Sequence, residues 1–257
     1  MPAKEVSVHH FVVLIRVVLA MVSGMATQQS NRPRTAIIVM GGVRPVIGLA
    51  SALEHDDALV ITADSGAVFA LAAGFAIDFA VGDFDSIPPP VLIDLEQSGV
   101  QIERHPAEKD ATDLELAIDI ALREGAEVIT IVGGHGGRVD QSLANALLLA
   151  SPRYAHLSMH ALLDSASVSV AHGGGGVTFV GKPGDVVSLL PMHGDAKGVR
   201  TEGLDYPLEG ETLAVGTTRG VSNVLSGLQA TVTLEVGTLL VVRPGPQITQ
   251  QKFGEIE

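Results

Sequence analysis

Two carboxylates stand in a spacing that suits a metal ion. Asp83 and Asp85 lie two residues apart in the sequence Gly-Asp-Phe-Asp-Ser, so their side chains share one face of an extended segment. A chain with no cysteine has no thiolate to offer zinc. Carboxylate oxygens favour a hard cation such as Mg²⁺, which commonly bridges one or two carboxylates to substrate phosphates. The pair therefore predicts a cation site that works on a phosphorylated ligand.

A glycine-rich segment further along the chain suits the phosphates. The sequence Gly-Gly-His-Gly-Gly-Arg-Val-Asp-Gln spans residues 133–141 and precedes a predicted helix. Glycine lets the backbone approach a ligand closely, and a helix N-terminus attracts anions. Arg138 adds a charged fork for phosphate oxygens. An acidic pair, a glycine loop and an arginine together indicate a metal–polyphosphate site.

Apolar runs that alternate with helical patterns must position these groups. Such alternation is typical of a parallel sheet with helices on both faces. We predict strands over Thr35–Met40, Ala58–Ala63, Phe79–Gly82, Val100–Arg104, Glu127–Val132 and Leu157–Leu163. We predict helices up to Ala73, from Pro88 to near Gly99, over Thr112–Glu124 and over Arg138–Ala150. The polar segments all follow strands, so they fall on the carboxyl edge where open parallel sheets bind ligands. They are Asp64, Asp83–Asp85, Lys109–Glu115 and Gly133–Gln141.

Each polar segment also has a purely structural interpretation. Thr112 and Glu115 form the pattern of a capping box, and Asp113 would sit favourably in the first helical turn. Asp83–Asp85 could be a polar turn, the glycine loop could be an ordinary connection, and His135 reads as a loop residue. Their joint placement on one edge is what favours a site.

No helices are predicted after Asp164. Short strands follow at close spacing, several with a period of two, which is typical of an antiparallel sandwich or barrel. They are Ser167–Ala171, Val177–Val180, Asp185–Leu190, Gln229–Val236 and Thr238–Val242. We interpret Gly173–Gly176 as a hairpin loop within this second domain. The predicted fold is an N-terminal, Rossmann-like α/β domain (35–164), a C-terminal β-sandwich domain (165–245) and a tail (246–257).

Composition and charge exclude several classes of protein. Of the 257 residues, 46% are hydrophobic and 18% charged, which indicates a packed core. The formal charge of −13 argues against a nucleic-acid partner, which would need a basic face. The apolar run Phe11–Val22 is too short to span a bilayer, and Arg16 interrupts it, so we expect no membrane partner and a cytoplasmic protein. Residues 1–34 read as an extension, with Met21 or Met25 as an alternative start.

The motifs resemble those of the thiamine pyrophosphokinase (thiamine diphosphokinase) family. The likeness rests on Gly-Asp-Phe-Asp-Ser (82–86), Lys-Asp-x-Thr-Asp-x-Glu (109–115) and Gly-Gly-Arg-x-Asp-Gln (136–141) followed by Asn145. It continues, in order, through Ser188–Pro191, Thr201–Leu208 and Gly220–Asn223, and so covers about residues 36–242.

The resemblance implies a transferase. Members move a diphosphate from ATP to the hydroxyl of thiamine, giving AMP and thiamine diphosphate, with Mg²⁺ or Mn²⁺ as the cation. It also implies a homodimer, in which the α/β domain of one subunit and the sandwich of the other share each active site.

The resemblance assigns roles to named positions. The metal ligands would be Asp83, Asp85 and Asp113. Phosphate oxygens would meet Lys109 and Arg138, and either Asp140 or Asp110 would orient or deprotonate the thiamine hydroxyl, beside Gln141. The ATP pocket would be lined by Asp64, Ser65, Gly66, Thr112, Gly133, Gly134, Gly136, Gly137 and Arg138. Thiamine would contact Tyr206, Ser222 and Asn223.

Some features keep other functions open. The chain has no Trp, so a tryptophan stacked on thiamine is absent and Tyr206 or a Phe would have to replace it. Residues 1–34 lie outside the family pattern. Gln141 stands where many bacterial members carry His, but other members carry Gln, so this departure changes little. A catalytically silent thiamine-binding protein and a diphosphotransferase for another alcohol are the alternatives.

Overall fold

A computed structural model describes residues 34–42, 57–163 and 165–245. The predicted N-terminal extension and the C-terminal tail lie outside the described residues, apart from Arg34. No helix in the described ranges combines the length and the apolar character that crossing a membrane requires.

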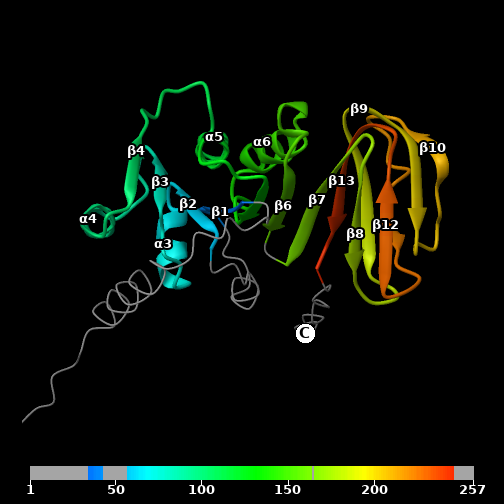
Figure 1. Ribbon diagram of the computed structural model, residues 1–257, viewed down its shortest axis with the longest axis horizontal. Helices are drawn as coiled ribbons and strands as arrows, with labels where there is room; N and C mark the ends of the chain where they lie inside the picture. The colour runs from blue at the N-terminus through cyan, green and yellow to red at the C-terminus, as the bar shows by residue number, and fades with distance from the viewer. Residues whose placement is uncertain (1–33, 43–56, 164, 246–257) are drawn as a thin grey trace, which may run out of the picture. The chain divides into compact units, whose positions relative to one another are not determined.

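The first half builds a parallel sheet, as predicted (Figure 1). Its strands are β1 (Thr35–Met40), β2 (Leu59–Ala63), β3 (Phe79–Gly82), β4 (Gln101–Arg104), β5 (Val128–Val132) and β6 (Ser158–Leu163). They lie in the order β4-β3-β2-β1-β5-β6. The chain therefore runs outward from β1 in one direction and then returns to β1's other side with β5. The carboxyl ends of β1 and β5 thus form the switch point at which such sheets bind ligands.

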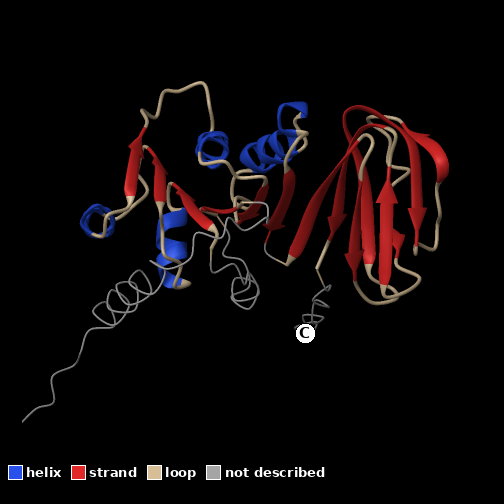
Figure 2. Cartoon of the chain, viewed as in Figure 1, coloured by secondary structure: helices blue, strands red, loops and turns tan. Residues whose placement is uncertain are grey.

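Helices cover both faces of this sheet, as Figure 2 shows. They are α3 (Gly66–Ala72), α4 (Pro89–Gln97), α5 (Asp113–Arg123) and α6 (Val139–Leu149), followed by a short 3₁₀ turn (Pro152–Tyr154). Side chains alternate along β1, so Ala36 and Ile38 join the core beneath α5, while Ile37 and Val39 join the core beneath α3 and α4. Burial on both faces is why these strands read as continuous apolar runs.

The second half is antiparallel, also as predicted. Its strands are β7 (Ala166–His172), β8 (Gly176–Val180), β9 (Val186–Glu202), β10 (Glu209–Leu213), β11 (Asn223–Val224), β12 (Gln229–Thr233) and β13 (Val236–Arg243). A separate apolar core fills it, including Phe179, Val187, Leu189 and Val232.

Two strand predictions in this half were wrong in extent. The predicted strand Gln229–Val236 ends at Thr233, and Val236 begins the next strand. The predicted strand Asp185–Leu190 is the first part of the 17-residue β9. That strand pairs with β13 along its first part, and with β10 and β12 further on. One long strand thus serves two sets of partners, which periodicity alone does not reveal.

Hydrogen-bonded strands connect the two halves. β6 pairs with β7, β7 with β13, and β13 with β9, all antiparallel, so the ladder continues past residue 164. The domain boundary at 164/165 stays a prediction. Gly173–Gly176 is not a hairpin between paired strands, because β7 and β8 are not neighbours in the sheet.

Candidate active site at the carboxyl edge of the parallel sheet

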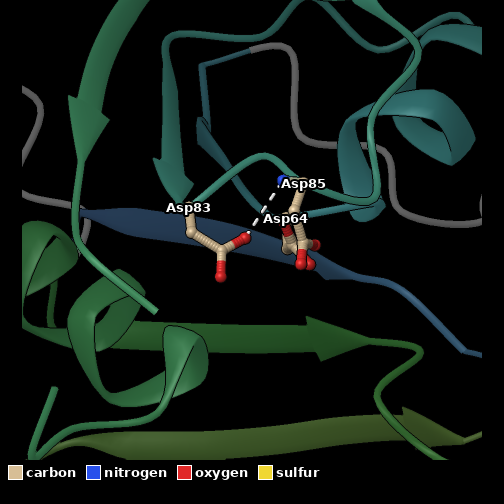
Figure 3. A group of neighbouring side chains, drawn as sticks. All are labelled: Asp64, Asp83 and Asp85. Carbon is tan, nitrogen blue, oxygen red and sulfur yellow. Dashed lines mark hydrogen bonds between the residues drawn. The ribbon is translucent and has the colours of Figure 1, made fainter. Parts of the chain in front are cut away.

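Three aspartates from two adjacent strands converge. Asp64 follows β2, and Asp83 and Asp85 follow β3; one carboxylate oxygen of each lies within 4.8 Å of the others (Figure 3). Register explains the meeting, because Ala63 pairs with Val81 and the Asp64 N–H donates to the Val81 carbonyl oxygen at 2.9 Å. Asp64 therefore lies beside the start of the Asp83–Asp85 segment.

The backbone around the trio is held in unusual conformations. Asp64 and Phe84 have φ angles of +50° and +63°, a region that side chains other than glycine rarely adopt. Residues in such conformations persist only where the surroundings hold them, and they gather at functional sites. Phe84 is 5% exposed and packs into the core beneath α3 and α4, with the Arg104 guanidinium 5.4 Å from its ring centre. Its burial anchors the turn, so the flanking aspartates lie outside the core.

The negative charges of these neighbouring carboxylates repel one another. Burial raises the pKa of Asp64, and the nearby carboxylates of Asp113, Asp83 and Asp85 raise it further, while a hydrogen bond from Ser86 (Oγ to Oδ2, 2.8 Å) opposes them. The Asp64 Oδ1 atom is buried and accepts no hydrogen bond from any described residue. An all-carboxylate set with an unsatisfied buried oxygen fits a hard cation of the Mg²⁺ or Mn²⁺ type.

Asp113, the third metal ligand expected from the sequence, stands apart from this trio. Its carboxylate binds the Lys109 ammonium at 2.8 Å, four residues earlier, and the Lys109 side chain is only 14% exposed. Thr112 caps α5 as predicted, accepting the Glu115 N–H at 3.3 Å. The Glu115 side chain does not close a capping box and instead pairs with Arg153 at 2.7 Å. The start of α5 is therefore held by ion pairs and a cap.

The glycine loop joins β5 to α6 at the switch point. Its four glycines all have φ between +71° and +87°. Arg138, Asp140 and Gln141 at the start of α6 are exposed, and the Arg138 guanidinium pairs with the Asp140 carboxylate through two contacts. This pairing lowers the pKa of Asp140. Asp110 is likewise exposed, so geometry leaves the choice between Asp110 and Asp140 open.

The start of α3 explains two further predicted positions. Gly66 is buried, and a Cβ there would lie 2.1 Å from the Val39 carbonyl oxygen, so α3 can approach β1 only with glycine at this point. Ser65 sits against Gly41, where an added Cβ would meet its Oγ at 2.1 Å. Both residues lie on the same edge as Asp64.

The residues predicted for thiamine gather in the antiparallel half. Asn223 is 7% exposed, and its amide binds the backbone of Tyr206, donating to the carbonyl oxygen at 2.7 Å and accepting the N–H at 3.1 Å. The Tyr206 side chain is 68% exposed. Ser222 has φ of +62°, and its N–H donates to the Ser188 hydroxyl at 3.1 Å. Asn223 therefore holds the loop that presents Tyr206.

Two residues have larger roles in the structure than the sequence indicated. Asp64 was expected only in the nucleotide pocket, although its place after β2, next to β3, was the signal that it could meet Asp83. Asn145 carried no expected role, yet its buried amide donates to the Gly134 carbonyl oxygen at 2.8 Å.

Comparisons with known proteins show the family. Residues 50–161 match the family model "Thiamin pyrophosphokinase, catalytic domain", and residues 178–239 match "Thiamin pyrophosphokinase, vitamin B1 binding domain". The thiamine pyrophosphokinase of Bacillus subtilis (strain 168) is 30% identical over 210 residues, which is 82% of this chain and 98% of that protein.

Solved structures of thiamine pyrophosphokinases share the fold of this chain. A crystal structure of thiamine pyrophosphokinase from Bacillus subtilis superposes with a TM-score of 0.74 at 27% identity, covering 83% of this chain and 100% of that one. The enzyme from Geobacillus thermodenitrificans superposes with a TM-score of 0.71 at 28% identity, covering 83% and 99%. The chain belongs to the thiamine pyrophosphokinase family.

Proposed function

We propose that this protein is a thiamine diphosphokinase, which transfers the terminal diphosphate of ATP to the hydroxyl of thiamine. The observation that carries the proposal is the carboxylate trio of Asp64, Asp83 and Asp85, at the same sheet edge as the glycine loop and the N-terminus of α6. Phosphoryl-type transfer asks a protein for positioning and charge neutralisation more than for covalent chemistry, and this edge supplies both.

The trio would hold the cation. Mg²⁺, or Mn²⁺, supplies positive charge that screens the phosphate oxygens and withdraws electrons from the phosphorus under attack. Asp64, Asp83 and Asp85 fit it by donor type and spacing. Asp113 contributes to the raised pKa of Asp64 but is paired with Lys109, so it would become a further ligand only if Lys109 released it and its carboxylate turned toward the trio.

The cationic groups would hold ATP. Arg138 is exposed at the start of α6, where the first backbone N–H groups of an 11-residue helix lack partners within the helix. A phosphate that binds Arg138 would take the place of the Asp140 carboxylate, because both present paired oxygens to the same guanidinium. Lys109, just before the start of α5, would neutralise a second phosphate.

Asp140 or Asp110 would orient or deprotonate the thiamine hydroxyl. While Asp140 is paired with Arg138, its lowered pKa makes it a weak base. Its release by a bound phosphate would remove that stabilisation. Among the described residues, Asp110 forms no ion pair that a bound phosphate would have to break. Turnover of Asp140→Asn and Asp110→Asn distinguishes the two, since only the true base should be essential.

The thiamine-binding residues would come from a second copy of the chain. In support, α6 exposes an apolar row in which Val139, Leu143 and Leu147 are 72%, 61% and 50% exposed. These residues recur every fourth position and so share one helix face, next to the active-site loop. A partner chain would cover this face and bring Ser222 and the Tyr206 ring, held by Asn223, to the site. An ATP-dependent reaction of this kind is expected in the cytoplasm.

The activity test follows AMP and thiamine diphosphate together. The purified full-length chain is incubated with ATP and thiamine, with Mg²⁺ or with a chelator. We expect equimolar AMP and thiamine diphosphate only with the metal. Thiamine binding without product would indicate a silent binding protein, product with another small alcohol in place of thiamine would indicate a different acceptor, and ADP in place of AMP would mean that a single phosphate is transferred.

Mixing two inactive variants tests the shared site. Asp83→Asn would disable the α/β half, and Ser222→Lys would place a bulky charge at the exposed thiamine face of the other half. In a dimer with shared sites, random mixing would restore about a quarter of the parent activity, because each mixed dimer contains one intact site. No recovery after subunit exchange would mean that each site is built within one chain.

A further inference from the structure

Asn145 is a buried polar residue on α6, in a helix that otherwise packs apolar side chains inward. It is 9% exposed. Its Nδ2 group donates to the Gly134 carbonyl oxygen at 2.8 Å, a bond that runs from the helix back to the loop preceding it. The side chain therefore connects α6 to the first half of the glycine loop.

Gly134 is held by neighbours on more than one side. Its N–H donates to the Gly41 carbonyl oxygen, after β1, at 2.8 Å. The preceding Gly133 donates to the Leu162 carbonyl oxygen, on β6, at 3.0 Å. These bonds fix the loop to the sheet through the backbone, and the Asn145 amide fixes it to α6.

The bond also explains why Gly134 has to be glycine. Its φ is +79°, and a Cβ would lie 3.2 Å from the Asn145 nitrogen and 3.2 Å from the Met40 Cγ atom. A side chain at this position would strain the backbone and would force Met40 and Asn145 to move by a few tenths of an ångström. Any change in the Asn145 contact would alter the loop where it turns toward Arg138.

The Asn145 side chain is a poor choice for stabilising the fold. Its Oδ1 atom is buried and accepts no hydrogen bond from any described residue. A buried acceptor without a partner is destabilising, and an apolar side chain of similar size would avoid that cost. A half-satisfied polar residue inside a helix interface suits a role in placing the loop better than a role in holding the fold.

We propose that Asn145 is a positioning residue for ATP, which holds the glycine loop in the shape that presents its N–H groups and Arg138 to the polyphosphate. The proposal rests on the proposed function only in taking ATP as the ligand. Because the loop serves the phosphates, loss of the Asn145 amide should weaken binding of ATP more than binding of AMP, and should leave thiamine binding unchanged.

The test measures nucleotide binding by calorimetry, without thiamine and with Mg²⁺, so it needs no turnover. Asn145→Leu removes the amide and its unsatisfied oxygen while keeping the branched shape and the number of heavy atoms of the side chain. We expect the affinity for ATP to fall about tenfold, the affinity for AMP to change by less than about twofold, and the melting temperature to stay level or rise. If the parent protein binds ATP but makes no product, the proposed function fails while this test still stands.

A matched control separates placement from packing. Leu149→Ala truncates a residue at the far end of the same helix that is 3% exposed, so it should lower the melting temperature and leave ATP affinity unchanged. Asn145→Ser, whose hydroxyl is too short to reach Gly134, covers the case in which the leucine variant does not fold. Parent-like ATP affinity in either folded Asn145 variant, or an equal loss in Leu149→Ala, would overturn the proposal.

Discussion

Replacing Asp64 with asparagine should stabilise the metal-free protein and remove its response to metal. Burial and three neighbouring carboxylates raise the pKa of Asp64, so the folded chain holds this proton more tightly than the unfolded chain does. The stability that this group contributes is present below its unfolded pKa, near 3.9, and is lost as pH rises through the folded pKa. At pH 7 the charge therefore opposes folding.

Coulomb's law gives the size of the effect. Two unit charges 4.8 Å apart repel by about 0.9 kcal/mol in bulk water and by about 3.5 kcal/mol at an effective dielectric constant of 20. The cluster is partly open to solvent, so the lower value applies to each pair. The Asp64→Asn substitution would remove two repulsions, to Asp83 and Asp85, and the new amide oxygen could still accept the Ser86 hydroxyl. The free energy of unfolding should rise by about 1–2 kcal/mol.

The assay is urea unfolding at pH 7 and low ionic strength, with a chelator or with excess Mg²⁺. The parent should gain about 2.7 kcal/mol at a metal concentration about one hundred times its dissociation constant, while Asp64→Asn should gain far less. Asp94→Asn, which removes one charge from the exposed side of α4, is the control and should match the parent within about 0.5 kcal/mol. A variant less stable than the parent without metal, or equally stabilised by Mg²⁺, would refute the assignment of Asp64 to the cation site.

Three further outcomes follow from the same structure. Asp83→Asn and Asp85→Asn should each lower kcat at least about 100-fold with unchanged circular dichroism, because a metal ligand and not a core residue is lost; near-parent turnover in both would contradict the metal site. Phe84→Ala should reduce the unfolding free energy by about 3–5 kcal/mol, and Phe84→Leu by under about 1.5 kcal/mol, as measured in urea; equal effects would mean that burial of the ring does not anchor the turn. Burial lowers the pKa of His172, so the stability that its neutral form contributes is present above the unfolded pKa near 6.5 and is lost as pH falls through the lower folded pKa. His172→Gln should flatten the dependence of the unfolding free energy on pH between about pH 7.5 and 5.5. An unchanged dependence would mean that another group causes it.

Local patterns were enough to place most of the α/β half. Strand β1 was predicted at its observed bounds, and Thr112 was predicted to start the helix that it caps. Apolar runs, capping residues and stop signals act between residues close in sequence, so they can be read without knowing the fold. The alternation of strands and helices then placed the polar segments on one edge, because successive parallel strands all end on the same side.

The antiparallel half was harder to predict for a physical reason. The 17-residue β9 changes partners along its length, and the segment Gln229–Val236 divides between two strands. Cross-strand partners, and not the residues' own sequence neighbours, determine where such strands begin and end. Likewise, nothing near Asn223 in the sequence shows that its amide donates a hydrogen bond to the backbone of Tyr206, 17 residues away.

The sequence by itself determined which residue types are available and which edge of the sheet they occupy, since both depend on local periodicity. Only the tertiary structure decided which of them meet. The register of β2 against β3 brings Asp64 to Asp83 and Asp85, while Asp113 pairs with Lys109 at the start of α5. The placement of α6 beside the glycine loop decides that Asn145 reaches Gly134. Contacts between residues far apart in the chain depend on register and packing, which no local pattern encodes.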